Sequence, residues 1–199
     1  MNWKTLYNPL AVLGKRSGLI VAMLVVIVLT AVAYWGGVHL DGALDLHINP
    51  VRPSLAMVAI ESLSAWLCLG LLLFAASKVF GGNGGVTGHL ASAGLARFPY
   101  IISAVISSRQ FLGGAMLAVV DVRGKEIVVH PEQMMTPAVI AGLLAVVALT
   151  IWSVAMLYCG YRETARTEGA KTVVSFIIGL VVAEIVSKII VMLAFNAGI

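Results

Sequence analysis

The amino-acid sequence predicts an all-α polytopic membrane protein, a bundle of five transmembrane helices joined by short loops. Apolar residues make up 60% of the chain and charged residues only 11%, whereas soluble domains are about half apolar and about a quarter charged. Five long apolar segments recur, each near the length of about 20 residues that a bilayer requires. They nearly exhaust the 199 residues. We therefore expect one transmembrane domain over residues 1–199, without a separate soluble domain.

The first predicted span, residues 19–36, is an uncharged run that follows a basic and aromatic lead. Asn8-Pro9 in that lead is typical of a helix start, because proline fits the first helical turn. A small-residue pattern at residues 31–33 also resembles a signal-peptide cleavage site. The apolar run continues past it to Trp35, which favours a retained span.

Residues 36–53 form a polar connection in which apolar and polar residues alternate, a pattern typical of a short strand or an interfacial segment. Together with a later loop it places histidines and carboxylates on one predicted face. Such a composition could bind a divalent metal such as zinc. The spacing of these residues is not diagnostic of a metal site, and polar outer loops often contain them. The candidate metal ligands are His39, Asp41, Asp45, His47 and His130.

The second predicted span, residues 54–77, begins at Ser54, which can cap the helix, and contains a single acid, Glu61. The third, residues 89–108, contains Arg97 and Pro99. Pro99 should kink its helix, because its ring removes a backbone donor. We expect Glu61 to find Arg97, Lys188 or a hydroxyl across the bundle, or to stay protonated. Arg97 is expected to cap the carbonyls that Pro99 frees, to reach lipid phosphate, or to pair with Glu61.

A glycine-rich loop, residues 81–85, precedes the third span. It lacks the Gly-Lys-Ser/Thr ending of a phosphate-binding loop, and Thr87 stands where a dinucleotide motif needs Gly or Ala. Gly88, Ser92 and Ala96 follow at intervals of four residues. This spacing predicts that a neighbouring helix approaches closely.

The apolar run at residues 111–120 is too short to span a bilayer. It could extend a long kinked third helix, or lie re-entrant or interfacial. Residues 121–131 read as short extended pieces around a tight turn at Arg123-Gly124, and could form a small β cap with the first outer connection. Thr136-Pro137 opens the fourth predicted span, residues 137–159. The fifth covers residues 171–195.

Ionisable residues inside membrane spans are candidates for function, because burying a charge is costly. Glu184 and Lys188 lie four residues apart on the fifth span, in the order that favours pairing along a helix. A self-neutralising pair needs no further role. A proton or ion relay made from Glu61, Glu184 and Lys188 is the alternative. No catalytic constellation and no cofactor are predicted.

The distribution of basic residues sets the predicted orientation. With a cytoplasmic N-terminus, seven Lys and Arg residues lie on the inner side and four on the outer side. This favours a cytoplasmic N-terminus and a C-terminus outside. The net charge of +4 is spread among loops, which predicts no nucleic-acid partner. Cys68 and Cys159 fall inside apolar spans and are expected to be unpaired.

The arrangement of these segments resembles the Yip domain family, Rab-GTPase-interacting membrane proteins with largely uncharacterised bacterial relatives. The resemblance is carried by the Asn8-Pro9 lead, the five apolar segments, and Gly94-Leu-Ala-Arg-Phe-Pro99 in the third of them. Leu95 stands where the family tends to have tyrosine. The Asp-Leu-aromatic-Gly-Pro motif of the eukaryotic members is absent. The resemblance implies the fold and residence in a membrane, here a bacterial inner membrane, and it implies no particular partner.

Three functions follow as hypotheses, of which the third is a metal-dependent membrane enzyme that uses the outer histidines. The first is a non-enzymatic integral membrane protein that organises membrane or partner proteins, in contact with the lipid bilayer and with a homo-oligomeric or other membrane-protein partner. The second is a small transporter, channel or lipid-moving protein. Its polar pathway would use buried residues of the spans. The candidates for binding or for a polar pathway are Glu61, Arg97, Pro99, Glu184 and Lys188.

Overall fold

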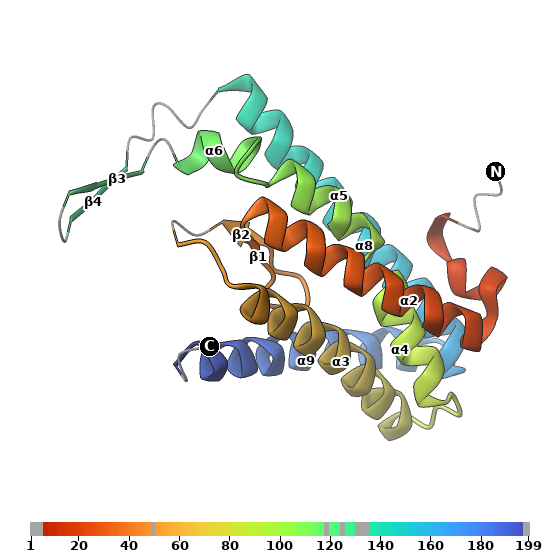
Figure 1. Cartoon of the computed structure of the whole chain (residues 1–199). Coiled ribbons are helices and arrows are strands. Elements are labelled where there is room, and N and C mark those ends of the chain that lie inside the picture. The colour runs from red at the N-terminus through yellow and green to blue at the C-terminus, as the bar shows by residue number, and fades with distance from the viewer. Residues whose placement is uncertain (1–5, 49–50, 118–119, 124–125, 130–135, 197–199) are drawn as a thin grey trace.

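The computed structural model describes residues 6–48, 51–117, 120–123, 126–129 and 136–196. Five helical segments are long and apolar enough to cross a membrane. They are α2 (Pro9–Gly36), α3 (Leu55–Val79), α4 with α5 (Val86–Ile106), α8 (Pro137–Ala165) and α9 (Ala170–Asn196). The predicted all-α polytopic bundle is therefore confirmed (Figure 1).

Three helices start at side-chain caps that the sequence predicts. Asn8 accepts a hydrogen bond from the amide of Ala11, Ser54 from Met57, and Thr136 from Val139. Each bond satisfies one of the amides that the first helical turn leaves without a partner. Helix α2 therefore begins at Pro9, ten residues before the predicted span at 19–36.

The third span is broken where the sequence predicts a kink. Helix α4 (Val86–Leu95) ends before Ala96 and Arg97, and α5 (Phe98–Ile106) begins immediately after them. Pro99 lies in the first turn of α5, where its missing amide would have no helical partner in any case. The break turns Arg97 into the buried interior of the bundle.

The segment after α5 is a separate short helix rather than a continuation of the third span. Helix α6 (Leu112–Leu117) follows the turn at residues 107–111, and the strands β3 (Val120–Arg123) and β4 (Glu126–Val129) follow it. The two strands pair antiparallel, with Arg123 opposite Glu126. They form their own sheet and share none with the first outer connection. Part of the predicted turn (residues 124–125) and His130 lie outside the described residues.

Close helix packing occurs at the small residues that the sequence singles out. Helix α3 packs along α9, and α2 along α4. The row formed by Gly88 and Ser92 on α4 and by Ala96 directly after it faces α8. A Cβ at Gly88 would come within 2.5 Å of the side chain of Thr164, and a Cβ at Gly160 within 2.7 Å of the Ser92 hydroxyl. The Ser153 hydroxyl donates to the carbonyl of Ala96 at 2.6 Å.

The connection between α2 and α3 folds into the bundle. Gly37 ends α2 in the left-handed conformation (φ 66°), which glycine adopts without strain. Strands β1 (Val38–His39) and β2 (His47–Ile48) then pair antiparallel, and the chain between them turns back inside the bundle (Figure 1). We call residues 37–48 the buried hairpin, since Val38 and Leu40 are fully buried. The predicted short strands are present, but the depth of this hairpin was not predicted.

Replacing Gly160 with leucine should destabilise the protein by about 1–3 kcal/mol, because the added side chain must displace Ser92 from the α4–α8 contact. Thermal unfolding of the purified protein in detergent measures the change. Val147→Leu is the control, since Val147 lies on the exposed face of the same helix. Equal melting temperatures for the two variants would contradict this account of the packing.

Candidate functional site

The candidate site is the buried hairpin together with the charged side chains that the spans direct at it. Arg97 reaches the tip of the hairpin from a position 11 residues after Val86 and 9 residues before Ile106. Glu184 reaches it from 14 residues after Ala170 and 12 residues before Asn196. Both positions are near the middle of a span, so the tip of the hairpin lies near the middle of the bundle.

Glu61 binds the first strand of the hairpin. Its side chain is fully buried. One carboxylate oxygen accepts a hydrogen bond from the amide of Leu40 at 2.8 Å, and the other lies 2.7 Å from His39 Nδ1. Both bonds are formed by the hairpin, whereas the sequence analysis expected Arg97, Lys188 or a hydroxyl as partner. The predicted side-chain partners are wrong, because the hairpin brings its own donors to the carboxylate. The other alternative, a protonated Glu61, stays a prediction.

Arg97 binds the tip of the hairpin. Its side chain is 1% exposed, and its Nη2 donates to the carbonyls of Ala43 at 3.2 Å and Gly42 at 3.4 Å. The hydrogen bonds of Arg97 among the described residues go to these hairpin carbonyls, and not to Glu61 or to carbonyls freed by Pro99 as predicted. The guanidinium also lies 5.7 Å from the ring centre of Tyr100, whose hydroxyl donates to Leu44 at 2.9 Å.

Glu184 and Lys188 bind the returning half of the hairpin from α9. Glu184 accepts from the amide of Leu44 at 2.9 Å. Lys188 lies 3.2 Å from Glu184 and 2.8 Å from Asp45. The predicted pair is thus present, but both members also hold the hairpin. Gly42 permits this contact, since a Cβ there would collide with the Glu184 carboxylate.

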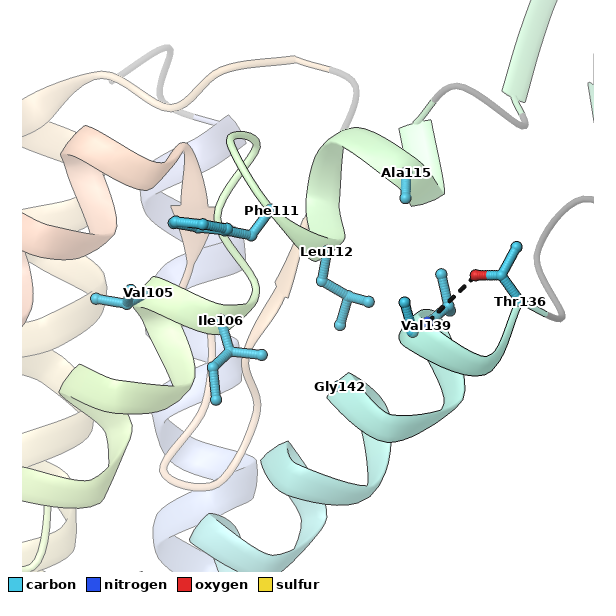
Figure 2. A pocket seen from close by; sticks show the side chains of 9 residues that line it. Val105, Ile106, Phe111, Leu112, Ala115, Thr136, Val139 and Gly142 are labelled. Carbon is cyan, nitrogen blue, oxygen red and sulfur yellow. Dashed lines mark hydrogen bonds between the residues drawn. The ribbon is translucent and has the colours of Figure 1, made fainter.

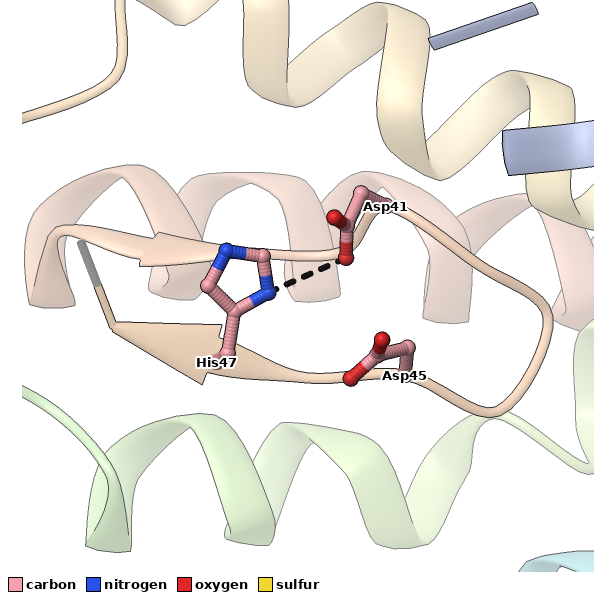
Figure 3. A group of neighbouring side chains, drawn as sticks. All are labelled: Asp41, Asp45 and His47. Carbon is pink, nitrogen blue, oxygen red and sulfur yellow. Dashed lines mark ion pairs between the residues drawn. The ribbon is translucent and has the colours of Figure 1, made fainter. Parts of the chain in front are cut away.

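Three of the predicted metal ligands come together beside the C-terminal part of α9. We call this group, Asp41, Asp45 and His47, the mouth of the hairpin. Donor atoms of Asp41, Asp45 and His47 all lie within 4.8 Å of one another (Figure 3). His47 Nδ1 is 3.0 Å from Asp41, and the ring of His39 stacks on that of His47 with centres 5.4 Å apart. His130 lies outside the described residues.

The contact between His47 and Asp41 shifts the pKa of both side chains. The hydrogen bond that His47 donates to the Asp41 carboxylate raises the pKa of His47 by more than burial lowers it. Burial raises the pKa of Asp41, but the hydrogen bond and the charge of His47 outweigh it and leave that pKa below its ordinary value. Both shifts favour the charged pair.

A cavity of about 340 Å³ lies beside this cluster, between the hairpin, α3 and α9. It holds both charged groups and the ends of apolar side chains. Its lining residues are His39, Asp41, His47, Met57, Glu61, Lys188, Val191, Met192 and Phe195.

A second cavity, of about 430 Å³, lies between α5, α6 and α8 and is almost wholly apolar (Figure 2). Val105, Ile106, Phe111 and Leu112 line it. Its hydroxyl, from Thr136, already accepts from the amide of Val139 at 3.3 Å. The chemistry of the described residues therefore gathers at the hairpin and not here.

Sequence reasoning missed Tyr100, the pairing of His39 with Glu61, and the buried His89. His89 contacts Phe74 and Tyr161 edge to face, and its Nδ1 bonds the carbonyl of Gly85 at 3.0 Å, which fits a packing role. A signal for the hairpin exists in the sequence. The connection is unusually apolar for a solvated loop, at Val38, Leu40, Leu44, Leu46 and Ile48.

Comparisons with known proteins give one match. No curated protein and no solved structure matches the chain significantly. The family description "Yip1 domain" matches residues 11–191. This range begins in α2 and ends in α9, and so contains all parts of the hairpin site. The chain therefore belongs to the Yip1 domain family of integral membrane proteins.

Proposed function

We propose that this chain is a non-enzymatic membrane protein that organises membrane or partner proteins, and that the buried hairpin makes its five spans a fixed platform. The observation that carries the proposal is that the buried charged side chains bind the backbone of the hairpin. Glu61, Arg97 and Glu184 each bind backbone groups of the hairpin. Their hydrogen bonds support a structural role.

A catalytic or transporting group must reach a substrate, and these groups are already engaged. Both carboxylate oxygens of Glu61 hold hairpin atoms, and Lys188 is shared between Glu184 and Asp45. Transport is supported less well than scaffolding, because a polar pathway needs such groups free to exchange ions or protons. Pro99, buried in the first turn of α5, fits a role in shaping the helix break.

The surface for a partner is best supported on α8. Four apolar residues on its exposed side follow one another at intervals of three and four, the spacing of a helix-packing seam, and alternate small and large side chains. They are Ala141, Leu144, Ala148 and Ile151. Leu144 and Ile151 are 65% and 64% exposed. A second copy of the chain is the simplest partner for this seam, with lipid covering the remaining apolar surface.

The proposed location is the bacterial inner membrane, with the N-terminus in the cytoplasm and one transmembrane domain over residues 1–199. The mouth of the hairpin and the C-terminal end of α9 then face outside, since they lie at the same end of the bundle (Figure 1). The excess of basic residues at the opposite end supports this orientation.

If the hairpin is held by Arg97, Arg97→Gln should raise hydrogen–deuterium exchange of the backbone amides at residues 38–46. Losing the guanidinium leaves the tip carbonyls without a donor and lowers the free energy of opening by about 1–3 kcal/mol. Mass spectrometry of the exchanged protein measures this. Arg162→Gln, at an exposed position of α8, is the control and should leave the hairpin protected. Equal protection in both variants would show that Arg97 does not hold the hairpin.

The platform proposal predicts a specific self-contact in membranes. In a variant whose Cys68 and Cys159 are replaced by alanine, Ala148→Cys should form a disulfide-linked dimer on mild oxidation. Ile177→Cys, an exposed apolar position on α9, should not. Gel electrophoresis without reductant detects the dimer. Cross-linking that is absent at both positions, or equal at both, argues against the seam, and a strictly monomeric protein without partners argues against the platform itself.

The orientation is tested by fusing alkaline phosphatase, which is active only outside the cytoplasm, to the C-terminus. We expect an active fusion, with an N-terminal fusion inactive as the control. The opposite pattern would invert the proposed topology and place the hairpin mouth in the cytoplasm.

A further inference from the structure

Three side chains of the types that bind metal ions lie together at the mouth of the buried hairpin. Asp41, Asp45 and His47 offer two carboxylates and an imidazole whose donor atoms lie within 4.8 Å of one another. Ligands of one zinc-sized ion lie about 2.0–2.2 Å from it. Two such ligands are then separated by roughly 3–4 Å, so small side-chain rotations would bring all three onto one ion.

A second, independent feature is the state of His39. The residue is 8% exposed and lines the same cavity as Asp41 and His47. Its Nε2 atom is buried and makes no hydrogen bond, although a buried imidazole nitrogen normally has a partner. Because this nitrogen lines the same cavity as Asp41 and His47, it is available to a ligand bound there.

The contact with Glu61 prepares this nitrogen for a metal. Glu61 lies 2.7 Å from His39 Nδ1, and a carboxylate in this position holds the proton on Nδ1. The lone pair is then on Nε2. Metal-binding histidines are commonly oriented by a carboxylate on their other nitrogen in this way.

Charge balance points in the same direction. Four carboxylates surround the hairpin, from Asp41, Asp45, Glu61 and Glu184. The cations beside it are Arg97 and Lys188, with Arg109 against Gly37. The carboxylates outnumber these cations, and this excess of negative charge favours binding of a cation. Lys188 can release Asp45 and keep its contact with Glu184 at 3.2 Å. The Lys188–Asp45 contact is partly exposed, so breaking it costs little.

We propose that the mouth of the hairpin binds a divalent transition-metal ion of the zinc class through Asp41, Asp45 and His47, with His39 as the fourth ligand. Two imidazoles with two carboxylates suit zinc better than magnesium or calcium, which prefer oxygen ligands alone. The ion would join the two strands of the hairpin. This site is additional to the platform role and does not depend on it.

The test uses the full chain purified in detergent with an affinity tag that contains no histidine, stripped with a chelator and dialysed. Titration with Zn²⁺ against a colorimetric indicator should show about one tightly bound ion per chain. Co²⁺ should give the visible absorption of a tetrahedral nitrogen and oxygen site. Zinc should also raise the melting temperature, since it binds the folded state.

His47→Ala and Asp45→Asn should each weaken Zn²⁺ binding by more than about tenfold, because each removes a direct ligand, and even loss of an outer partner has an effect of this size. Both residues are only partly buried, so the variants should fold. Helix content by circular dichroism checks this. Glu163→Gln is the control. It removes an exposed carboxylate at the C-terminal end of α8, outside the proposed site, and should bind zinc as the unmodified chain does.

Failure of the unmodified protein to take up stoichiometric zinc or cobalt overturns the proposal. It is also overturned if zinc is bound but His47→Ala and Asp45→Asn bind it as tightly, because the ion then lies elsewhere. If one of the two variants does not fold, the other decides. Neither negative result affects the platform proposal, which the cross-linking at α8 tests separately.

Discussion

The structure depends on one constraint: a charged group or a free peptide group inside a membrane bundle must have a partner. A hairpin turn has unpaired amides and carbonyls, and the spans carry buried charges. The two sets bond to each other. Glu61 and Glu184 accept amides of the hairpin at Leu40 and Leu44, while Arg97 donates to its tip carbonyls. Neither the hairpin nor the charges would be stable there alone.

These hydrogen bonds between the spans and the hairpin also fix how the helices are placed. Glu61 on α3 holds the first strand, Arg97 at the α4–α5 break holds the tip, and Glu184 on α9 holds the returning strand. Three spans thus share one small element. The break before Pro99 matters here, because it leaves Arg97 between two helices with its side chain directed inward. Close packing of α4 on α8 through Gly88 and Gly160 completes the arrangement around it.

The sequence predicts the parts of the fold that depend on local chemistry. The caps at Asn8, Ser54 and Thr136, the kink near Pro99 and the glycine row of α4 follow from residue types and their spacing. The partners of Glu61 and Arg97 could not be predicted in this way. They are backbone groups, which every residue has, so no residue type marks them. Long-range geometry decides them, and the only sequence sign was the apolar character of the connection itself.

The same hydrogen bonds limit the functions that the charged side chains can have. A fixed hairpin excludes the free movement of its charged partners, and this favours a platform over a transport route. The mouth differs from the tip: Asp41, Asp45 and His47 are only partly buried and are held mainly by one another and by Lys188. An ion bound at the mouth would therefore act on a hairpin that is already anchored, and through His39 and Glu61 it would contact α3 directly.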